Sequence, residues 1–137
     1  MIGLDTPVLL AILRGDPRTK TLLRRLEAEE VCTTAANVFE LEALARLDPS
    51  TGREHRLSAL DRLRRKLTIL PVDDRAAVLA AGYASKDATH SVPSETWLIL
   101  GALEANGCSE WVTMPTASFP KVSKVVRVSV LAPYHPK

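Results

Sequence analysis

Short apolar runs alternate with helical segments along most of this 137-residue chain. Helix signals follow the runs: a capping residue, a proline that can open a helix, or leucines at helical spacing. This alternation predicts a mainly parallel five-stranded sheet covered by helices, a three-layer α/β/α arrangement. The expected strands are residues 1–4, 31–34, 67–70, 111–113 and 125–130, and the expected helices cover 7–13, 18–30, 35–47, a leucine-striped segment between 57 and 67, 74–84 and 95–105.

The size and composition of the chain predict one domain over residues 1–137, because 46% hydrophobic residues are enough to bury an ordinary core. Lys and Arg exceed Asp and Glu by only 18 to 16, so affinity for nucleic acid would need local clusters of basic residues. The chain has no apolar run of membrane-spanning length and no signal-peptide pattern, so we expect a cytoplasmic protein. Cys32 and Cys108 are expected to be reduced structural thiols.

Three acidic residues lie at positions where we expect an apolar surface or the ligand crevice of the sheet. Asp5 follows the first expected strand and precedes Thr6 and Pro7, at the edge where parallel sheets place their ligand crevice and where Thr113 is also expected. Glu40 shares a helical face with Leu44 and Leu47 that is expected to point toward the sheet, and Glu95 heads the apolar stripe of a later helix, so an unpaired charge at either position is costly. Three inward carboxylates from separate elements would suit Mg²⁺ or Mn²⁺, which can orient water for attack on a phosphate.

Each acid also has a structural interpretation. Asp5 can be a turn or capping residue, although Thr6 is better placed to cap a helix that opens with Pro7. Glu95 stands in a first helical turn, where any acid gains from the helix dipole. Glu42 has Arg46 one turn later, and we interpret that pair as solvated surface.

The order of these motifs resembles the PIN domain, the fold of many metal-dependent ribonucleases and of the toxins in VapBC toxin–antitoxin pairs. Ile2–Leu10 is similar to the family's opening strand and its Asp-Thr-Asn-Val motif, with Pro7 in place of the Asn. Thr34–Leu41 is similar to the second motif, which ends in a metal-binding Glu, and here that residue is Glu40. Leu67–Asp73 resembles the strand and proline that follow the family's middle helix.

The third and fourth motifs depart from the family pattern. Glu95 stands where the family has an Asp at the head of a helix, so that the acid is longer by one methylene. The fourth motif normally has a Thr followed two residues later by Asp or Asn, whereas Thr113–Phe119 contains no acid. The hydroxyl residues available as contacts to a bound water or substrate are Thr6, Thr113, Thr116 and Ser118.

The resemblance implies a Mg²⁺- or Mn²⁺-dependent endoribonuclease that hydrolyses RNA phosphodiester bonds, with Asp5, Glu40 and Glu95 as metal ligands and catalytic residues. It also implies a small antitoxin partner and a homodimer. The alternative is a PIN-fold protein without catalysis that binds RNA or another protein. The densest basic run is either the solvated face of a helix or a track for RNA phosphates; it comprises Arg62, Arg64, Arg65 and Lys66.

Overall fold

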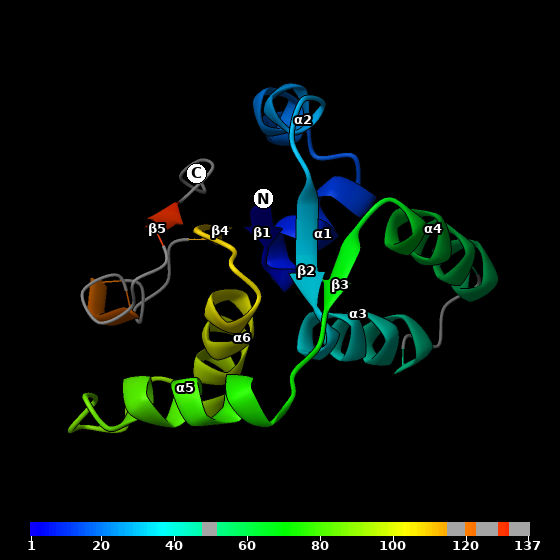
Figure 1. Ribbon diagram of the computed structural model, residues 1–137. Helices are drawn as coiled ribbons and strands as arrows, with labels where there is room; N and C mark the ends of the chain where they lie inside the picture. Colours follow the sequence, from blue (N-terminus) through cyan, green and yellow to red (C-terminus); the bar gives the residue numbers. More distant parts are fainter. Residues whose placement is uncertain (48–51, 115–119, 123–128, 132–137) are drawn as a thin grey trace.

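The computed structural model describes residues 1–47, 52–114, 120–122 and 129–131 (Figure 1). Five short strands form one sheet in the order β3-β2-β1-β4-β5, and every neighbouring pair is parallel. The predicted parallel α/β sheet is therefore confirmed. The strands are β1 (Ile2–Leu4), β2 (Val31–Thr34), β3 (Thr68–Leu70), β4 (Glu110–Val112) and β5 (Ser129–Leu131).

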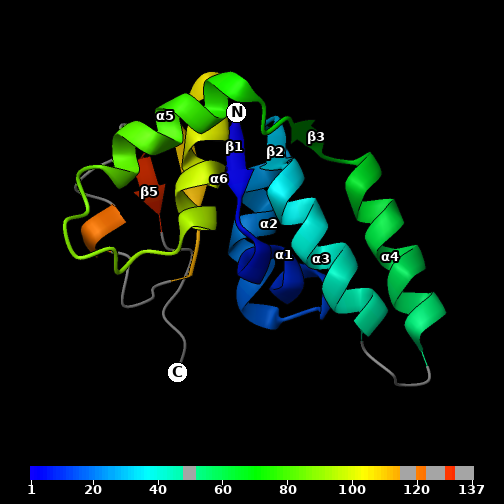
Figure 2. The ribbon, with the colours of Figure 1, turned by 90° about the horizontal axis from the view of Figure 1, so that it is seen from below.

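The helices connect successive strands and cover both faces of the sheet. Figure 2 shows α5 and α6 on one side of β1, with α3 and α4 on the other. None of the helices in the described ranges is long and apolar enough to cross a membrane. Their bounds are α1 (Thr6–Leu13), a 3-10 turn (Pro17–Thr19), α2 (Lys20–Leu26), α3 (Ala35–Leu47), α4 (Arg53–Arg65), α5 (Asp74–Ala84) and α6 (Ser94–Ala105).

Two apolar clusters, one on each face, account for this layering. Side chains alternate along a strand, so neighbouring residues enter opposite clusters. Ile2, Leu4 and Val112 pack with leucines of α1 to α4. Cys32 and Trp111 pack instead with side chains of α5 and α6. Each face of the sheet is thus buried under its own set of helices.

The helix predicted over residues 18–30 is wrong at both ends. A 3-10 turn occupies Pro17–Thr19, where the Asp16 carboxylate accepts a hydrogen bond from the backbone N–H of Arg18 at 2.9 Å. The α-helix ends at Leu26, before a segment that contains Glu27, Glu29 and Glu30. Acids at the C-terminal end of a helix oppose its dipole, which disfavours extension through this segment. The last predicted strand, 125–130, overlaps β5 at residues 129 and 130, and its positions 125–128 lie outside the described residues.

Helices α5 and α6 pack closely because α6 carries a glycine at their contact. A Cβ atom added at Gly101 would lie 2.3 Å from the carbonyl oxygen of Ala76 and 2.9 Å from the backbone nitrogen of Ala80. The rings of Tyr83 and Trp97 meet across the same pair of helices, with centroids 6.4 Å apart. This contact fixes the direction of α6 and hence the position of its first turn, which carries Glu95.

The two cysteines meet over β1. Cys32 and Cys108 are buried free thiols, and their sulfur atoms lie 3.6 Å apart. Gly3 of β1 pairs with Cys32 in the sheet, and a Cβ at Gly3 would lie 3.4 Å from the Cys108 sulfur. The absence of a side chain at Gly3 leaves the room in which the thiols make contact.

Candidate metal centre

Asp5 lies directly after β1 and caps helix α1. Its Oδ1 accepts the backbone N–H of Thr6 at 2.9 Å, and its own N–H donates to the carbonyl of Val112 in β4. The prediction that Thr6 caps this helix is wrong: Thr6 is the first helical residue, and Pro7 is the second. Pro7 fits there because N–H groups of the first turn have no partner within the helix. The shift leaves the Thr6 hydroxyl free to donate to Glu40 Oε1 at 3.1 Å.

Thr34 and Asn37 form a reciprocal cap at the start of α3. The backbone N–H of Asn37 donates to Thr34 Oγ1 at 3.3 Å. In return, the backbone N–H and the hydroxyl of Thr34 donate to Asn37 Oδ1 at 3.2 and 2.7 Å. The pattern is that of a capping box with Asn in place of the usual Glu or Gln. It holds the side chain of Asn37 inside the protein, beside the end of β1.

Three donors surround the carboxylate of Asp5. In addition to the Thr6 N–H, Asn37 Nδ2 donates to Oδ1 at 3.0 Å and Thr113 Oγ1 donates to Oδ2 at 2.6 Å. Thr113 follows β4 and Thr34 ends β2, so the carboxyl ends of three adjacent strands supply this environment. A carboxylate has about four acceptor directions, so one remains for a further ligand.

The charge of Glu95 acts on both Asp5 and Glu40 and raises the pKa of each. Burial raises the pKa of Glu40 to about 7, with further contributions from the charge of Glu95, from Asp5 and from a hydrogen bond to Glu95. Burial also raises the pKa of Asp5 above its ordinary value, although its hydrogen bonds oppose that change and Glu95 adds to it. The structure therefore brings the three predicted acids to one end of the sheet.

The orientations predicted for two of these acids need correction. The buried residues of α3 are Asn37 and Leu41, one position away from the expected stripe, so Glu40 lies at the border of the buried face. Leu44 and Leu47, expected to face the sheet, are 50% and 78% exposed. Glu95 is exposed at the head of α6 and approaches the other acids from the solvent side.

The chemistry of this donor set fits a divalent cation. Burial and the neighbouring acid Glu95 favour the protonated forms of Asp5 and Glu40, and no described ion pair offers either of them a cation, so a bound divalent cation would take the place of those protons. Hard carboxylate oxygens are the ligands that Mg²⁺ and Mn²⁺ prefer. Within the part of the chain that the structure describes, no three acidic, histidine or cysteine side chains already stand as ligands around one point. Binding would therefore require the acids to draw together.

Asn37 is the residue that the sequence analysis missed at this site. The second motif, Thr34–Leu41, contains Asn37 but assigns it no role. The sequence does contain a signal. Asn37 lies four residues before Leu41, so both residues share one helical face, and it lies three residues after Thr34, where the strand ends. A buried amide requires several hydrogen-bond partners. Since polar side chains were expected only at the strand ends, an amide on this face should lie beside them.

The remaining predicted contacts lie elsewhere. Thr116 and Ser118 lie outside the described residues. The basic run lies on the exposed face of α4, where Arg64 pairs with Glu42 at 3.2 Å and Arg65 pairs with Asp61 at 2.8 Å. Arg62 contacts Ser58 at 3.4 Å, and Lys66 is exposed at the end of the helix. The predicted surface pair of Glu42 with Arg46 is confirmed at 3.3 Å.

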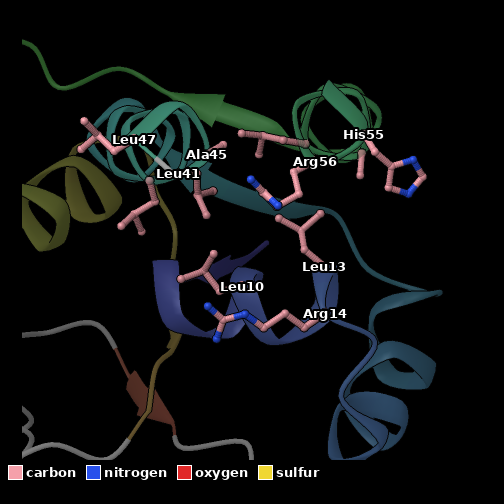
Figure 3. A pocket seen from close by; sticks show the side chains of 11 residues that line it. Leu10, Leu13, Arg14, Leu41, Ala45, Leu47, His55 and Arg56 are labelled. Atoms are coloured by element: carbon pink, nitrogen blue, oxygen red, sulfur yellow. The ribbon is translucent and has the colours of Figure 1, made fainter. Parts of the chain in front are cut away.

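A separate apolar pocket of about 480 Å³ lies between α1, α3 and α4 (Figure 3). Its walls are aliphatic, and Arg14, His55 and Arg56 bring positive or titratable groups to it. In Figure 3, Leu10 and Leu13 of α1 face Leu41 and Ala45 of α3 across the space. Leu44 and Leu47 also line this pocket, so their exposed side chains face the pocket and not the core. The other lining residues are Ala59 and Leu60.

Comparison with protein families identifies the class of this fold and site. The PIN domain model matches residues 2–101, which is most of the chain. The chain therefore belongs to the PIN domain family, and the resemblance described above is confirmed. Comparison with curated protein sequences gives no match.

Several solved structures share the fold over almost the whole chain, and one of them is a toxin–antitoxin complex from Klebsiella pneumoniae, 16% identical over 99% of this chain and 100% of the other, with a TM-score of 0.75. The structure of FitAcB from Neisseria gonorrhoeae is 27% identical, covers 99% of this chain and 100% of the other, and has a TM-score of 0.79. FitAB bound to an IR36 DNA fragment is 23% identical over 100% and 98% of the two chains, with a TM-score of 0.81. VapBC2 from Rickettsia felis, bound to promoter DNA, is 15% identical over 96% and 98%, with a TM-score of 0.77.

Proposed function

We propose that this protein is a divalent-metal-dependent endoribonuclease of the PIN toxin type that hydrolyses RNA phosphodiester bonds. The proposal is supported by the hydrogen bonds that join Asp5 to Asn37, Asn37 to Thr6 and Thr6 to Glu40, and by the charge of Glu95, which acts on both acids. These residues would hold Mg²⁺ or Mn²⁺, which supplies an activated water and stabilises charge on the phosphate. Thr113 and Asn37 orient Asp5, and Thr6 orients Glu40.

Cleavage of RNA with and without Mn²⁺ tests this function. We expect metal-dependent cleavage by the wild type and a loss of about 100-fold or more in Asp5→Asn, because asparagine keeps the shape of the side chain but lacks the carboxylate charge that would hold the cation. Asp61→Asn is the matched control, since Asp61 is exposed on α4 and pairs with Arg65. Equal, metal-independent cleavage by the wild type and Asp5→Asn would refute the proposal.

The second candidate function is a PIN-fold module that binds RNA or protein without catalysis. It is favoured by the fourth motif, where Thr113–Phe119 lacks both family acids, and by the longer Glu95 in the third. Calorimetric titration with Mn²⁺ separates the two functions. Binding that is abolished by Glu40→Gln or Glu95→Gln contradicts the inert module, whereas a wild type that neither binds Mn²⁺ nor cleaves RNA supports it.

An antitoxin is the proposed occupant of the apolar pocket. One structure that shares the fold is a toxin–antitoxin complex from Klebsiella pneumoniae, and the aliphatic lining with Arg14 beside it suits an amphipathic helix that also carries an acid. Co-expression with the product of a short adjacent gene tests this role. Leu44→Asp should abolish co-purification, whereas Leu23→Asp, at another exposed leucine, should not. Retention of the complex by both variants would refute the assignment.

We also infer a homodimer, as the family resemblance implies. Phe39 of α3 and Val78 of α5 are large apolar side chains that the single chain leaves exposed. Sedimentation velocity measures the state of assembly. We expect Phe39→Asp to shift a dimer toward the monomer, and a wild type that remains monomeric at all concentrations would contradict this inference.

A further inference from the structure

Asn37 lies wholly buried between Asp5 and Thr6, in the candidate metal centre. Its side chain is 0% exposed, and it joins α3 to the loop between β1 and α1. Its Nδ2 atom lies 3.0 Å from both Asp5 Oδ1 and Thr6 Oγ1. One amide group therefore contacts a proposed ligand directly and contacts the hydroxyl that orients a second ligand.

The orientation of this amide is determined by its neighbours. The backbone N–H of Thr34 can only donate, and it faces Asn37 Oδ1 at 3.2 Å. A flipped amide would place its NH₂ group against that N–H and its oxygen against the carboxylate of Asp5. Both contacts would be repulsive, so Asn37 must direct its two donors at Asp5 and Thr6.

The direction of the hydrogen bonds continues from Asn37 to Glu40. Thr6 Oγ1 accepts from Asn37 Nδ2, so its single proton is available for Glu40 Oε1 at 3.1 Å. Asp5 and Glu40 thus each receive a donor whose direction Asn37 sets. Asn37 therefore determines which lone pairs of Asp5 and of Glu40 remain available to a further ligand.

We infer that Asn37 is the positioning residue of the metal centre, which holds Asp5 and, through Thr6, Glu40 so that their remaining acceptor directions serve a divalent cation. This inference rests on the proposed function. Asn37 is not itself a ligand, because its oxygen is turned away from the acids and accepts two hydrogen bonds from Thr34. Groups that orient metal ligands commonly change metal affinity by about 10- to 100-fold when they are replaced.

Asn37→Asp separates positioning from a purely structural role. Aspartate has the same shape and keeps one oxygen for the two donors of Thr34, so the cap of α3 is retained. Its second oxygen faces Asp5 and Thr6 where Asn37 supplied donors. The matched control is Asn106→Asp, because Asn106 is the other asparagine of the chain and its Nδ2 donates to the Ala102 carbonyl at the end of α6.

Calorimetric titration of the folded full-length chain with Mn²⁺ at pH 7 is the measurement. We expect binding to be about 10- to 100-fold weaker in Asn37→Ala, which removes the donors without adding charge, and within about twofold of the wild type in Asn106→Asp. Asn37→Asp is titrated alongside, and circular dichroism checks that each variant is folded.

The outcomes distinguish the inference from the function on which it rests. Equal or tighter Mn²⁺ binding by folded Asn37→Ala overturns the positioning role and leaves the proposed nuclease standing. A wild type that binds no Mn²⁺ overturns both. A loss shared equally by the Asn106 variant assigns the effect to general destabilisation and also overturns the positioning role.

Discussion

Replacing Gly101 with alanine should destabilise the protein, because the backbone of α5 occupies the space that the new methyl group needs. The added Cβ would lie 2.3 Å from the Ala76 carbonyl oxygen and 2.9 Å from the Ala80 nitrogen. Ordinary contact lies near about 3.5 Å, so α6 must move away from α5 by roughly 1 Å. Overpacking of this kind costs about 1–3 kcal/mol, and alanine returns about 0.5–1 kcal/mol through its better helix propensity.

The expected net effect is a decrease of about 1–2 kcal/mol in the free energy of unfolding, or about 4–8 °C in melting temperature for a domain of this size. Urea unfolding followed by circular dichroism measures it. Gly82→Ala is the control, because Gly82 lies in α5 with no atom within 4 Å of an added Cβ. That variant should gain about 0.5–1 kcal/mol. A Gly101→Ala protein as stable as the wild type would refute the packing argument.

Three further outcomes are expected. Raising the pH from about 5 to about 7 should lower the stability of the metal-free protein, because Glu40 binds its proton more tightly when folded, with a pKa of about 7, than at its ordinary 4.5; urea unfolding across this range should give a smaller slope for Glu40→Gln, and an unchanged slope would contradict the assignment. Mn²⁺ at about 100 times its dissociation constant should stabilise the fold by about 2.7 kcal/mol, seen as a higher melting temperature that Asp5→Asn does not show. Cys32 and Cys108 should resist a soluble thiol reagent until denaturant is added, since both are buried; rapid labelling of the native protein would disprove that burial.

The order of strands and helices could be predicted from the sequence because it depends on local signals. Helix α3 has the predicted bounds, from Ala35 after β2 to Leu47. Failures occurred where two local signals competed. Asp5 and Thr6 are both good capping residues, and nothing local decides between them. Over residues 18–30 the leucine spacing favoured one helix, whereas the acids at its end favoured an earlier stop.

The candidate site could be predicted only in part because side-chain orientation depends on packing between distant elements. Periodicity identified Glu40 as a residue near the buried face of α3, but the rotation of that helix is fixed by Asn37 and Leu41. Glu95 was expected to point inward because it heads an apolar stripe, but the side chain is exposed at the start of α6. Leu44 and Leu47 looked like core residues, since the sequence cannot distinguish a core from a pocket.

Helices α1 and α3 each connect the acidic centre to the apolar pocket. Helix α1 begins beside Asp5 and ends at Leu13 of the pocket, and in α3 Glu40 directly precedes Leu41, another lining residue. An eight-residue helix such as α1 spans about 12 Å. A substitution that changes the packing of these lining residues therefore acts on the same two helices that begin beside Asp5 or carry Glu40.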